Sequence, residues 1–272
     1  MNHLVQEWNP DWTLEIIPAH AERVAILDGL VDEIYITMIP GSPTSQSLEA
    51  MRIVKNAGFQ PVPHIAARNF ASEQELEGFI EEANGIGIRK ALLLAGGQSS
   101  AIGPYSETLD VMGSKAFGKS KLSAVCVAGH PEGNPEDSNA MQSLEKKLEL
   151  LSSLGFATEI VTQWSFSPEK VSQYISDLRS RDINSPVRVG VAGPASLKTL
   201  LKYAKICGVD AATSVIKKQG FNLARLLVSN NPDTFISKID GSASFHLYPF
   251  GGLSKCAQWL EGQHRLQSAL PS

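Results

Sequence analysis

The chain has 272 residues, of which 43% are hydrophobic and 19% are charged, and its formal net charge is −4 at pH 7. This composition is sufficient for a full hydrophobic core, and the absence of a long basic tract argues against binding to nucleic acid or to an anionic membrane. No apolar run reaches the roughly 18 residues that a membrane span needs.

The N-terminal segment, 1–11, has neither the basic start nor the apolar centre of a secretory signal, so we expect a cytoplasmic protein. Cys126, Cys207 and Cys256 are widely spaced and each lies among apolar residues. Buried thiols of this kind fit a reducing compartment. The spacing predicts no disulfide framework and no metal site.

Short apolar runs, typical of buried strands, alternate along the chain with segments of helical pattern. The expected strands cover 13–17, 33–37, 62–65, 91–94, 122–127, 158–163, 187–191 and 244–248. Helices are expected at 19–30, 42–57, 72–83 and 137–154. A further helix is expected to follow Pro168, another to end at Cys207, and a closing helix to end near Gly262. Helical structure is also expected within 209–239.

Eight strands alternating with helices predict an α/β architecture, and runs without strict alternation are typical of a parallel sheet buried on both faces. Eight such units in roughly 250 residues have the size of a (β/α)8 TIM barrel. We therefore expect one domain over 1–272, with 1–12 as an N-terminal extension. An open doubly wound sheet is the alternative, but the first strand is not followed by a glycine-rich phosphate fingerprint.

Polar residues and glycines concentrate where these strands end, which is where a TIM barrel carries its chemistry. They are Glu15, Thr37, His64, Gly96, Gly97, His130, Gln163, Gly193 and Tyr248. The set contains no defensible Ser-His-Asp order, no metal-ligand spacing and no glycosidase pair of carboxylates. One acid among neutral hydrogen-bonding groups suits a planar ligand with polar edges.

Glu15 lies inside an apolar run, and an ionised glutamate is costly to bury unless it is paired. Two interpretations are open at this point. Glu15 either faces water or a salt-bridge partner at a strand edge, or it faces a functional cavity.

Several of these motifs, taken in order, resemble those of the 5,10-methylenetetrahydrofolate reductase family, and the resemblance covers about 14–260. In the first half of the chain, Leu14–Pro18 matches Phe-Glu-Phe-Phe-Pro, Ile36 and Thr37 match Val-Thr, and Pro63 and His64 match Pro-His. Next, Tyr105–Leu109 matches Tyr-Ala-Ser-Asp-Leu, and Gly129–Glu136 matches Tyr-Pro-x-x-His-Pro-Glu. Finally, Thr162 and Gln163 match part of Ile-Thr-Gln-Phe-Phe-Phe, and Phe245–Tyr248 matches Phe-His-Phe-Tyr. Each match is short, and the shared order makes the set specific.

The resemblance implies an oxidoreductase of one-carbon metabolism that reduces 5,10-methylenetetrahydrofolate to 5-methyltetrahydrofolate. It implies that Glu15 is the general acid, with a pKa raised by the barrel mouth so that the group can protonate N10 of the folate. Gln163 is implied to hydrogen-bond the pterin, because a carboxamide presents a donor and an acceptor side by side. Gly97 and Tyr248 are further substrate-side positions.

NAD(P)H is the implied hydride donor, and FAD is the implied cofactor. Its contacts would be Thr37, His64, Tyr105, His130 and Asn134. A second interpretation of His64, as a core histidine that bonds to backbone, stays open.

The chain departs from the family where the family's fourth strand ends in Leu-Arg-Gly-Asp. This sequence has Leu94-Ala95-Gly96-Gly97 there. Two routes therefore remain open, one through FAD with altered contacts and one by direct hydride transfer from NAD(P)H.

Two functions of other classes remain as alternatives. One is a non-catalytic folate-binding accessory barrel that works with a partner subunit, and the other is a folate-linked methyl-transfer enzyme on the same scaffold. The expected partner in each case is a small tetrahydrofolate derivative. A homo-oligomer is left open.

Overall fold

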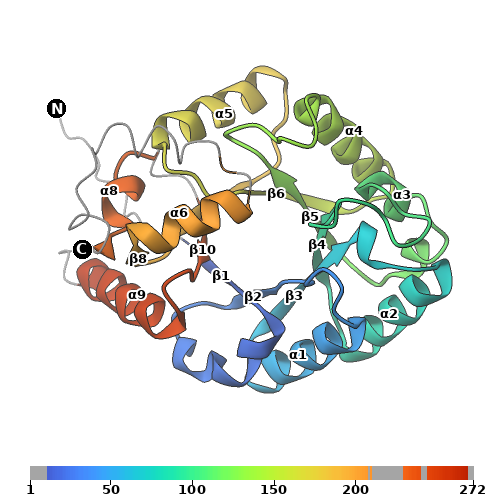
Figure 1. Cartoon of the computed structure of the whole chain (residues 1–272), viewed down its shortest axis with the longest axis horizontal. Helices are drawn as coiled ribbons and strands as arrows, with labels where there is room; N and C mark the ends of the chain where they lie inside the picture. The colour runs from blue at the N-terminus through green and yellow to red at the C-terminus, as the bar shows by residue number, and fades with distance from the viewer. Residues whose placement is uncertain (1–10, 208, 210–228, 240–243, 269–272) are drawn as a thin grey trace.

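A computed structural model describes residues 11–207, 209, 229–239 and 244–268. Its centre is a closed barrel of parallel strands in the order β1-β10-β7-β6-β5-β4-β3-β2 (Figure 1). The barrel strands are β1 (Trp12–Ile16), β2 (Glu33–Ile36), β3 (Gln60–Ala66), β4 (Lys90–Leu94), β5 (Ala124–Gly129), β6 (Ala157–Thr162), β7 (Val187–Ala192) and β10 (Ser244–Tyr248). The predicted (β/α)8 fold is confirmed, and the open sheet is excluded because β1 pairs with both β2 and β10.

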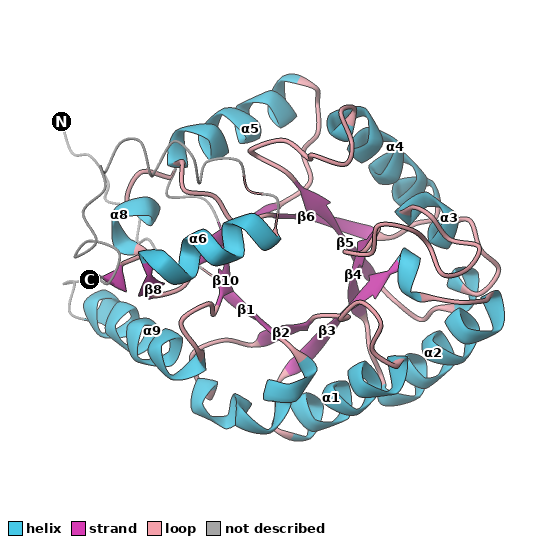
Figure 2. Ribbon diagram, viewed as in Figure 1, coloured by secondary structure: helices cyan, strands magenta, loops and turns pink. Residues whose placement is uncertain are grey.

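Helices surround the barrel on its outside (Figure 2). They are η1 (Pro18–Leu27), α1 (Thr44–Asn56), η2 (Ala67–Asn69), α2 (Glu73–Ile86), α3 (Thr108–Met112), η3 (Phe117–Lys119), α4 (Ala140–Ser153), α5 (Pro168–Ser180), α6 (Leu197–Ile206), α8 (Asp233–Ile236) and α9 (Leu253–Ser268). The main hydrophobic core lies between these helices and the outward-facing side chains of the strands, such as Leu14, Ile65 and Leu93.

The segment expected as a helix over 19–30 is instead the 3-10 helix η1. Its buried residues are Ala21, Val24 and Leu27, which are three positions apart. A helix with three residues per turn places side chains i and i+3 on one face, so this spacing buries a single face in a 3-10 helix. The expected helical segment is therefore present, and its helix type is 3-10.

Two expected segments fall largely outside the described residues. The N-terminal extension is one, because residues 1–10 are not described and β1 already begins at Trp12. The helical segment over 209–239 is the other. Its described part contains the helix α8 and the strand β9 (Ser229–Asn230), which pairs antiparallel with β8 (Ala195–Ser196).

Charged side chains fill the barrel interior at the end where the strands begin. Lys90 Nζ lies 2.8 Å from Glu33 Oε2 and 2.6 Å from Glu159 Oε2. Arg188 Nε lies 2.9 Å from Glu159 Oε1, and Arg188 Nη2 lies 2.8 Å from Asp11 Oδ2. We call these five residues the barrel floor. Each charge is paired, as burial requires, and the floor closes this end of the barrel.

Among the described residues, no helix combines the length and the apolar character that crossing a bilayer requires.

Candidate functional site

Glu15 projects into the barrel from β1 and meets two histidines from neighbouring parts of the barrel wall. His64 Nε2, from β3, lies 3.2 Å from Glu15 Oε2. His246 Nε2, from β10, lies 3.7 Å from the same oxygen. The Glu15 side chain is 18% exposed, whereas His64 and His246 are buried. Glu15 is therefore an interior carboxylate paired with imidazoles, and it is not among the residues that line the cavities described below.

Thr13 fixes the second of these rings. Thr13 and His246 are register partners in the parallel pair of β1 and β10, so both side chains point into the barrel at the same level. The Thr13 hydroxyl oxygen lies 2.8 Å from His246 Nδ1. The ring also packs edge-on against Tyr35 and Tyr248, with centroids 4.6 and 4.9 Å away. His246 is thus held on three sides.

The pKa of Glu15 is lowered to about 2. Burial alone would raise this pKa, but the charge of His64 and the hydrogen-bonding capacity of both rings outweigh it. The expectation of a raised pKa is therefore wrong, because the imidazoles replace the water that the carboxylate loses. Burial lowers the pKa of His246, which keeps that ring neutral.

A cavity of about 430 Å³ opens at the end of the barrel where the strands finish. Five residues predicted from the sequence line it, namely Gly96, Gly97, His130, Asn134 and Gln163. The Gln163 carboxamide is oriented by its own chain, because Oε1 accepts the Trp164 backbone N–H at 3.1 Å. This leaves the amide nitrogen available to a ligand. A cavity of this size is in the range that holds small organic ligands.

His130 separates this cavity from a second one of about 270 Å³, which Asn134, Tyr174 and Asp137 also line. Burial, reinforced by the charge of Lys147, lowers the pKa of His130 to about 4. His130 is therefore neutral at pH 7 and can offer both a donor and an acceptor. Burial also lowers the pKa of Lys147, which faces the larger cavity.

Thr37, Tyr105 and Tyr248 are not among the residues that line the two cavities. The Thr37 hydroxyl donates to Ile16 O at 2.6 Å, which ties the end of β2 to β1. The Tyr248 hydroxyl donates to Thr162 O at 3.2 Å. Tyr105 is only 5% exposed. Their predicted roles as flavin and substrate contacts remain predictions.

The residues matched to flavin contacts do not form one surface in this structure. His130 and Asn134 face the larger cavity, but the Thr37 hydroxyl is committed to backbone and His64 faces Glu15. Ala95 and Gly97 stand where the resemblance places the arginine and the aspartate of Leu-Arg-Gly-Asp. The chain's own residues therefore fit the expected FAD pocket poorly.

Arg68, which sequence reasoning missed, ties together the loops around the larger cavity. Its Nη1 donates to Gln98 O at 2.8 Å and lies 2.8 Å from Glu136 Oε2. Its Nε donates to Ser106 O at 3.0 Å. His246 and Thr13 were also missed as site residues. The signal that could have found them is period-two alternation, since His246 and Tyr248 alternate with the core residues Phe245 and Leu247.

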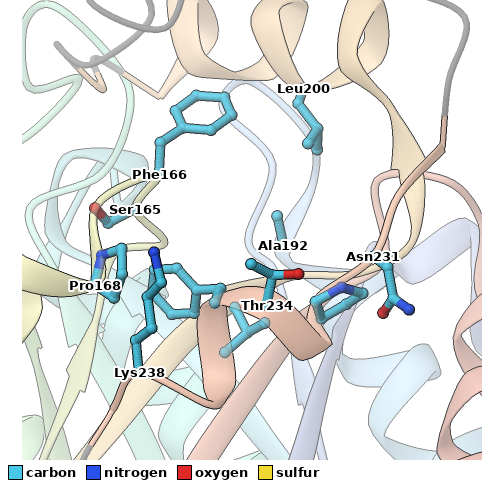
Figure 3. A pocket seen from close by; sticks show the side chains of 11 residues that line it. Ser165, Phe166, Pro168, Ala192, Leu200, Asn231, Thr234 and Lys238 are labelled. Carbon is cyan, nitrogen blue, oxygen red and sulfur yellow. The ribbon is translucent and has the colours of Figure 1, made fainter.

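A third cavity, of about 140 Å³, lies between the loop after β6 and the helices α6 and α8. Figure 3 shows Phe166 and Leu200 on one side of it and Thr234 and Lys238 on the other. No site residue was predicted there, and the contact between Ser165 and Glu132 beside it, at 2.6 Å, is a local hydrogen bond.

Solved structures with similar folds are very distant in sequence. One is 2,3-dimethylmalate lyase, a member of the PEP mutase/isocitrate lyase superfamily, with 13% identity, coverage of 96% of this chain and 84% of that chain, and a TM-score of 0.51. Another is a putative phosphonomutase from Burkholderia cenocepacia J2315, with 11% identity, coverage of 96% and 94%, and a TM-score of 0.49. At this identity, the likeness to the lyase supports the barrel fold alone.

A family model gives more specific information. The model for methylenetetrahydrofolate reductase matches residues 21–221, which is well over half of the chain. The match spans the strand ends that supply His64, Gly97, His130 and Gln163. The chain therefore belongs to the methylenetetrahydrofolate reductase family.

Proposed function

We propose that this protein reduces 5,10-methylenetetrahydrofolate to 5-methyltetrahydrofolate with NAD(P)H as the hydride donor. One observation carries the proposal beyond family membership. A buried carboxylate, Glu15, sits against two imidazoles at the end of the barrel where TIM-barrel enzymes carry out their chemistry. A protein that only binds folate gains little from such a group.

The chemistry requires a proton before it requires a hydride. The one-carbon unit of the substrate is held in a five-membered ring between N5 and N10, and this ring must open to an iminium before hydride can add. Protonation makes N10 a better leaving group. Glu15 is the acid in this proposal, and it can act once its carboxylate has been loaded with a proton from a neighbouring group.

The larger cavity supplies the polar edges that a pterin needs. The Gln163 amide nitrogen is free to donate, and neutral His130 offers a donor and an acceptor at the same cavity. At Gly97, the nearest atom to an added Cβ would be Pro40 Cγ at 3.4 Å, so the glycine leaves room for a flat ring against the backbone. These residues bind and orient the substrate in the proposal.

Because the expected FAD contacts do not share one surface, the proposed reaction runs without a flavin. The nicotinamide would enter the same cavity and place its hydride-bearing carbon about 3–3.5 Å from the methylene carbon.

The test is NADH or NADPH oxidation driven by methylenetetrahydrofolate, on protein stripped of bound cofactor, with and without added FAD. Turnover without FAD supports the proposal as stated. Turnover only with FAD keeps the overall reaction and corrects the route. Folate binding without turnover under any of these conditions contradicts the proposal and favours the accessory barrel. Methyl transfer without oxidation of the nicotinamide favours the methyl-transfer alternative.

Glu15→Gln removes the proton from the proposed acid while keeping the shape of the side chain. We expect turnover to fall by about 10²–10⁴-fold, the usual range for a general acid, while folate still binds. Near-normal turnover of this variant would remove Glu15 from the mechanism.

A further inference from the structure

His64 faces the Glu15 carboxylate rather than the cavity where a flavin contact would be needed. Its Nε2 lies 3.2 Å from Glu15 Oε2, and it is not among the residues that line the larger cavity. The two atoms do not form a hydrogen bond in this structure, but their separation is within the reach of proton transfer once the groups align. His64 is therefore placed to act on the acid itself.

The second histidine has a different role, set by Thr13. The single proton of the Thr13 hydroxyl can go to His246 Nδ1 at 2.8 Å or to Phe245 O at 3.4 Å, and the shorter contact is the better hydrogen bond. We assign Nδ1 as the acceptor, so the proton of the neutral ring sits on Nε2. His246 then presents an N–H toward Glu15 Oε2 without carrying a charge.

A carboxylate held in this way cannot protonate a substrate unless it receives a proton first. His246 is fully buried, and its Nε2 lies 3.7 Å from Glu15 Oε2, beyond hydrogen-bond distance. His64 lies against the same oxygen, and in its imidazolium form it has a proton to give. Of the two rings, His64 makes the closer contact with Glu15 Oε2, at 3.2 Å against 3.7 Å for His246.

We propose that His64 is a positioning residue that stores the proton for the reaction and loads it onto Glu15. This inference rests on the reduction proposed above. The proton on His64 Nε2 moves to Glu15 Oε2, and the Glu15 proton then moves to N10 of the folate. His64 ends as a neutral ring and N10 ends protonated, so one proton is transferred in total. Exclusion of water by the bound substrate favours the first transfer, because it replaces two buried charges with two neutral groups.

The other titratable and charged groups around this unit come from four further parts of the fold. The charge of Glu15 acts on Tyr248 of β10 and on Cys207 after α6. The charge of Arg188 on β7 acts on His246, and Tyr35 on β2 packs against both rings. Burial raises the pKa values of Tyr35, Tyr248 and Cys207, so all three stay neutral at pH 7. Arg188 remains charged, but it is paired with Glu159 and Asp11.

The first test is His64→Gln, which keeps a polar side chain but cannot carry the proton. We expect kcat to fall by about 10²-fold or more, with the KM values for folate and NAD(P)H within about twofold of the wild-type values. The matched control is His264→Gln on the outer helix α9, which should leave both parameters unchanged. A loss confined to KM or to affinity for FAD would overturn the proposal and restore His64 as a cofactor contact.

A second measurement needs no turnover, so it separates failure of this inference from failure of the proposed reaction. Infrared difference spectra between wild type and Glu15→Gln report the protonation of Glu15 alone. We expect the Glu15 carboxylate to take up its proton at a higher pH in His64→Gln than in the wild type, because burial then raises the Glu15 pKa with less opposition. Identical difference spectra with wild-type His64 and with His64→Gln would show that His64 does not affect the protonation of Glu15, and would overturn the inference.

The Thr13 side chain provides a graded check on the same unit. Thr13→Ser keeps the hydroxyl that fixes His246, whereas Thr13→Val keeps the shape and removes it. In the Thr13→Val variant, neutral His246 loses the partner that holds its proton on Nε2, so the pH at which Glu15 takes up a proton should rise. The Thr13→Ser variant should behave as the wild type does. Equal infrared titrations for Val and Ser would contradict the role assigned to His246.

Discussion

Acid should destabilise the wild-type protein more steeply than the Glu15→Gln variant. In the folded protein the Glu15 pKa is about 2, whereas the ordinary value for an exposed glutamate is 4.5. The folded state therefore releases this proton more readily than the unfolded chain does. A lowered folded-state pKa stabilises the protein above the unfolded pKa, and this stabilisation disappears as the pH falls toward the folded value.

The magnitude follows from the two pKa values. The difference, 4.5 − 2 = 2.5 pKa units, corresponds to about 3 kcal/mol, because one unit is worth about 1.36 kcal/mol. Part of this contribution to the free energy of unfolding can be measured at an accessible pH. At pH 3.5 the linkage relation gives a loss of about 1.4 kcal/mol relative to pH 7 from Glu15 alone. The side chain is only 18% exposed, so solvent screens the effect weakly.

Urea unfolding followed by circular dichroism measures the free energy of unfolding at pH 7, 5, 4 and 3.5 for both proteins. Other carboxylates contribute equally to the two curves, so the difference between the curves isolates Glu15. We expect the difference in free energy of unfolding between the wild type and Glu15→Gln to fall by about 1.4 kcal/mol between pH 7 and pH 3.5. Parallel curves would refute the pairing of Glu15 with the two histidines.

Three further predictions concern other parts of the barrel. Gln163→Ala should weaken folate binding measured by calorimetry while leaving the melting temperature close to that of the wild type, and an unchanged Kd would remove Gln163 from the ligand site. Glu159→Gln should lower the free energy of unfolding in urea by about 3–5 kcal/mol, because it breaks a buried charge network with Lys90 and Arg188. A loss below about 1 kcal/mol would show that the barrel floor is not important for stability. Cys126, whose pKa burial raises to about 12, should resist a thiol reagent at pH 8 in the folded protein and react fully in urea, and rapid labelling of the native protein would contradict its burial.

Local signals in the sequence were sufficient for most elements of the fold. The start of α2 is an example, because the hydroxyl of the N-cap residue Ser72 accepts the Glu75 N–H at 3.2 Å. The Glu75 side chain accepts the N–H of Ala71, one residue before the cap. The apolar run in β4 is another, since Ala91 and Leu93 face the core and Leu92 faces the barrel interior. These patterns depend only on residues a few positions apart.

The site was less predictable, because its contacts join residues that are distant in sequence. Glu15 could be singled out as a carboxylate in an apolar run, but nothing near it indicates that two imidazoles lower its pKa. The same holds for the barrel floor, where Lys90 and Arg188 are paired with carboxylates from other strands. Alternation shows that a residue points inward, and it does not show which inward-pointing residues meet.

The pairing of β1 with β10 has a consequence for biogenesis. Thr13 and His246 are separated by 233 positions, yet they meet across the seam at which the first and last strands close the barrel. A ribosome has to complete nearly the whole chain before Glu15 can meet its second imidazole. Fragments that end before β10 can contain the carboxylate and His64 but lack His246, so the surroundings of Glu15 are complete only when the last strand docks. Any assay of Glu15 chemistry is therefore also an assay of barrel closure.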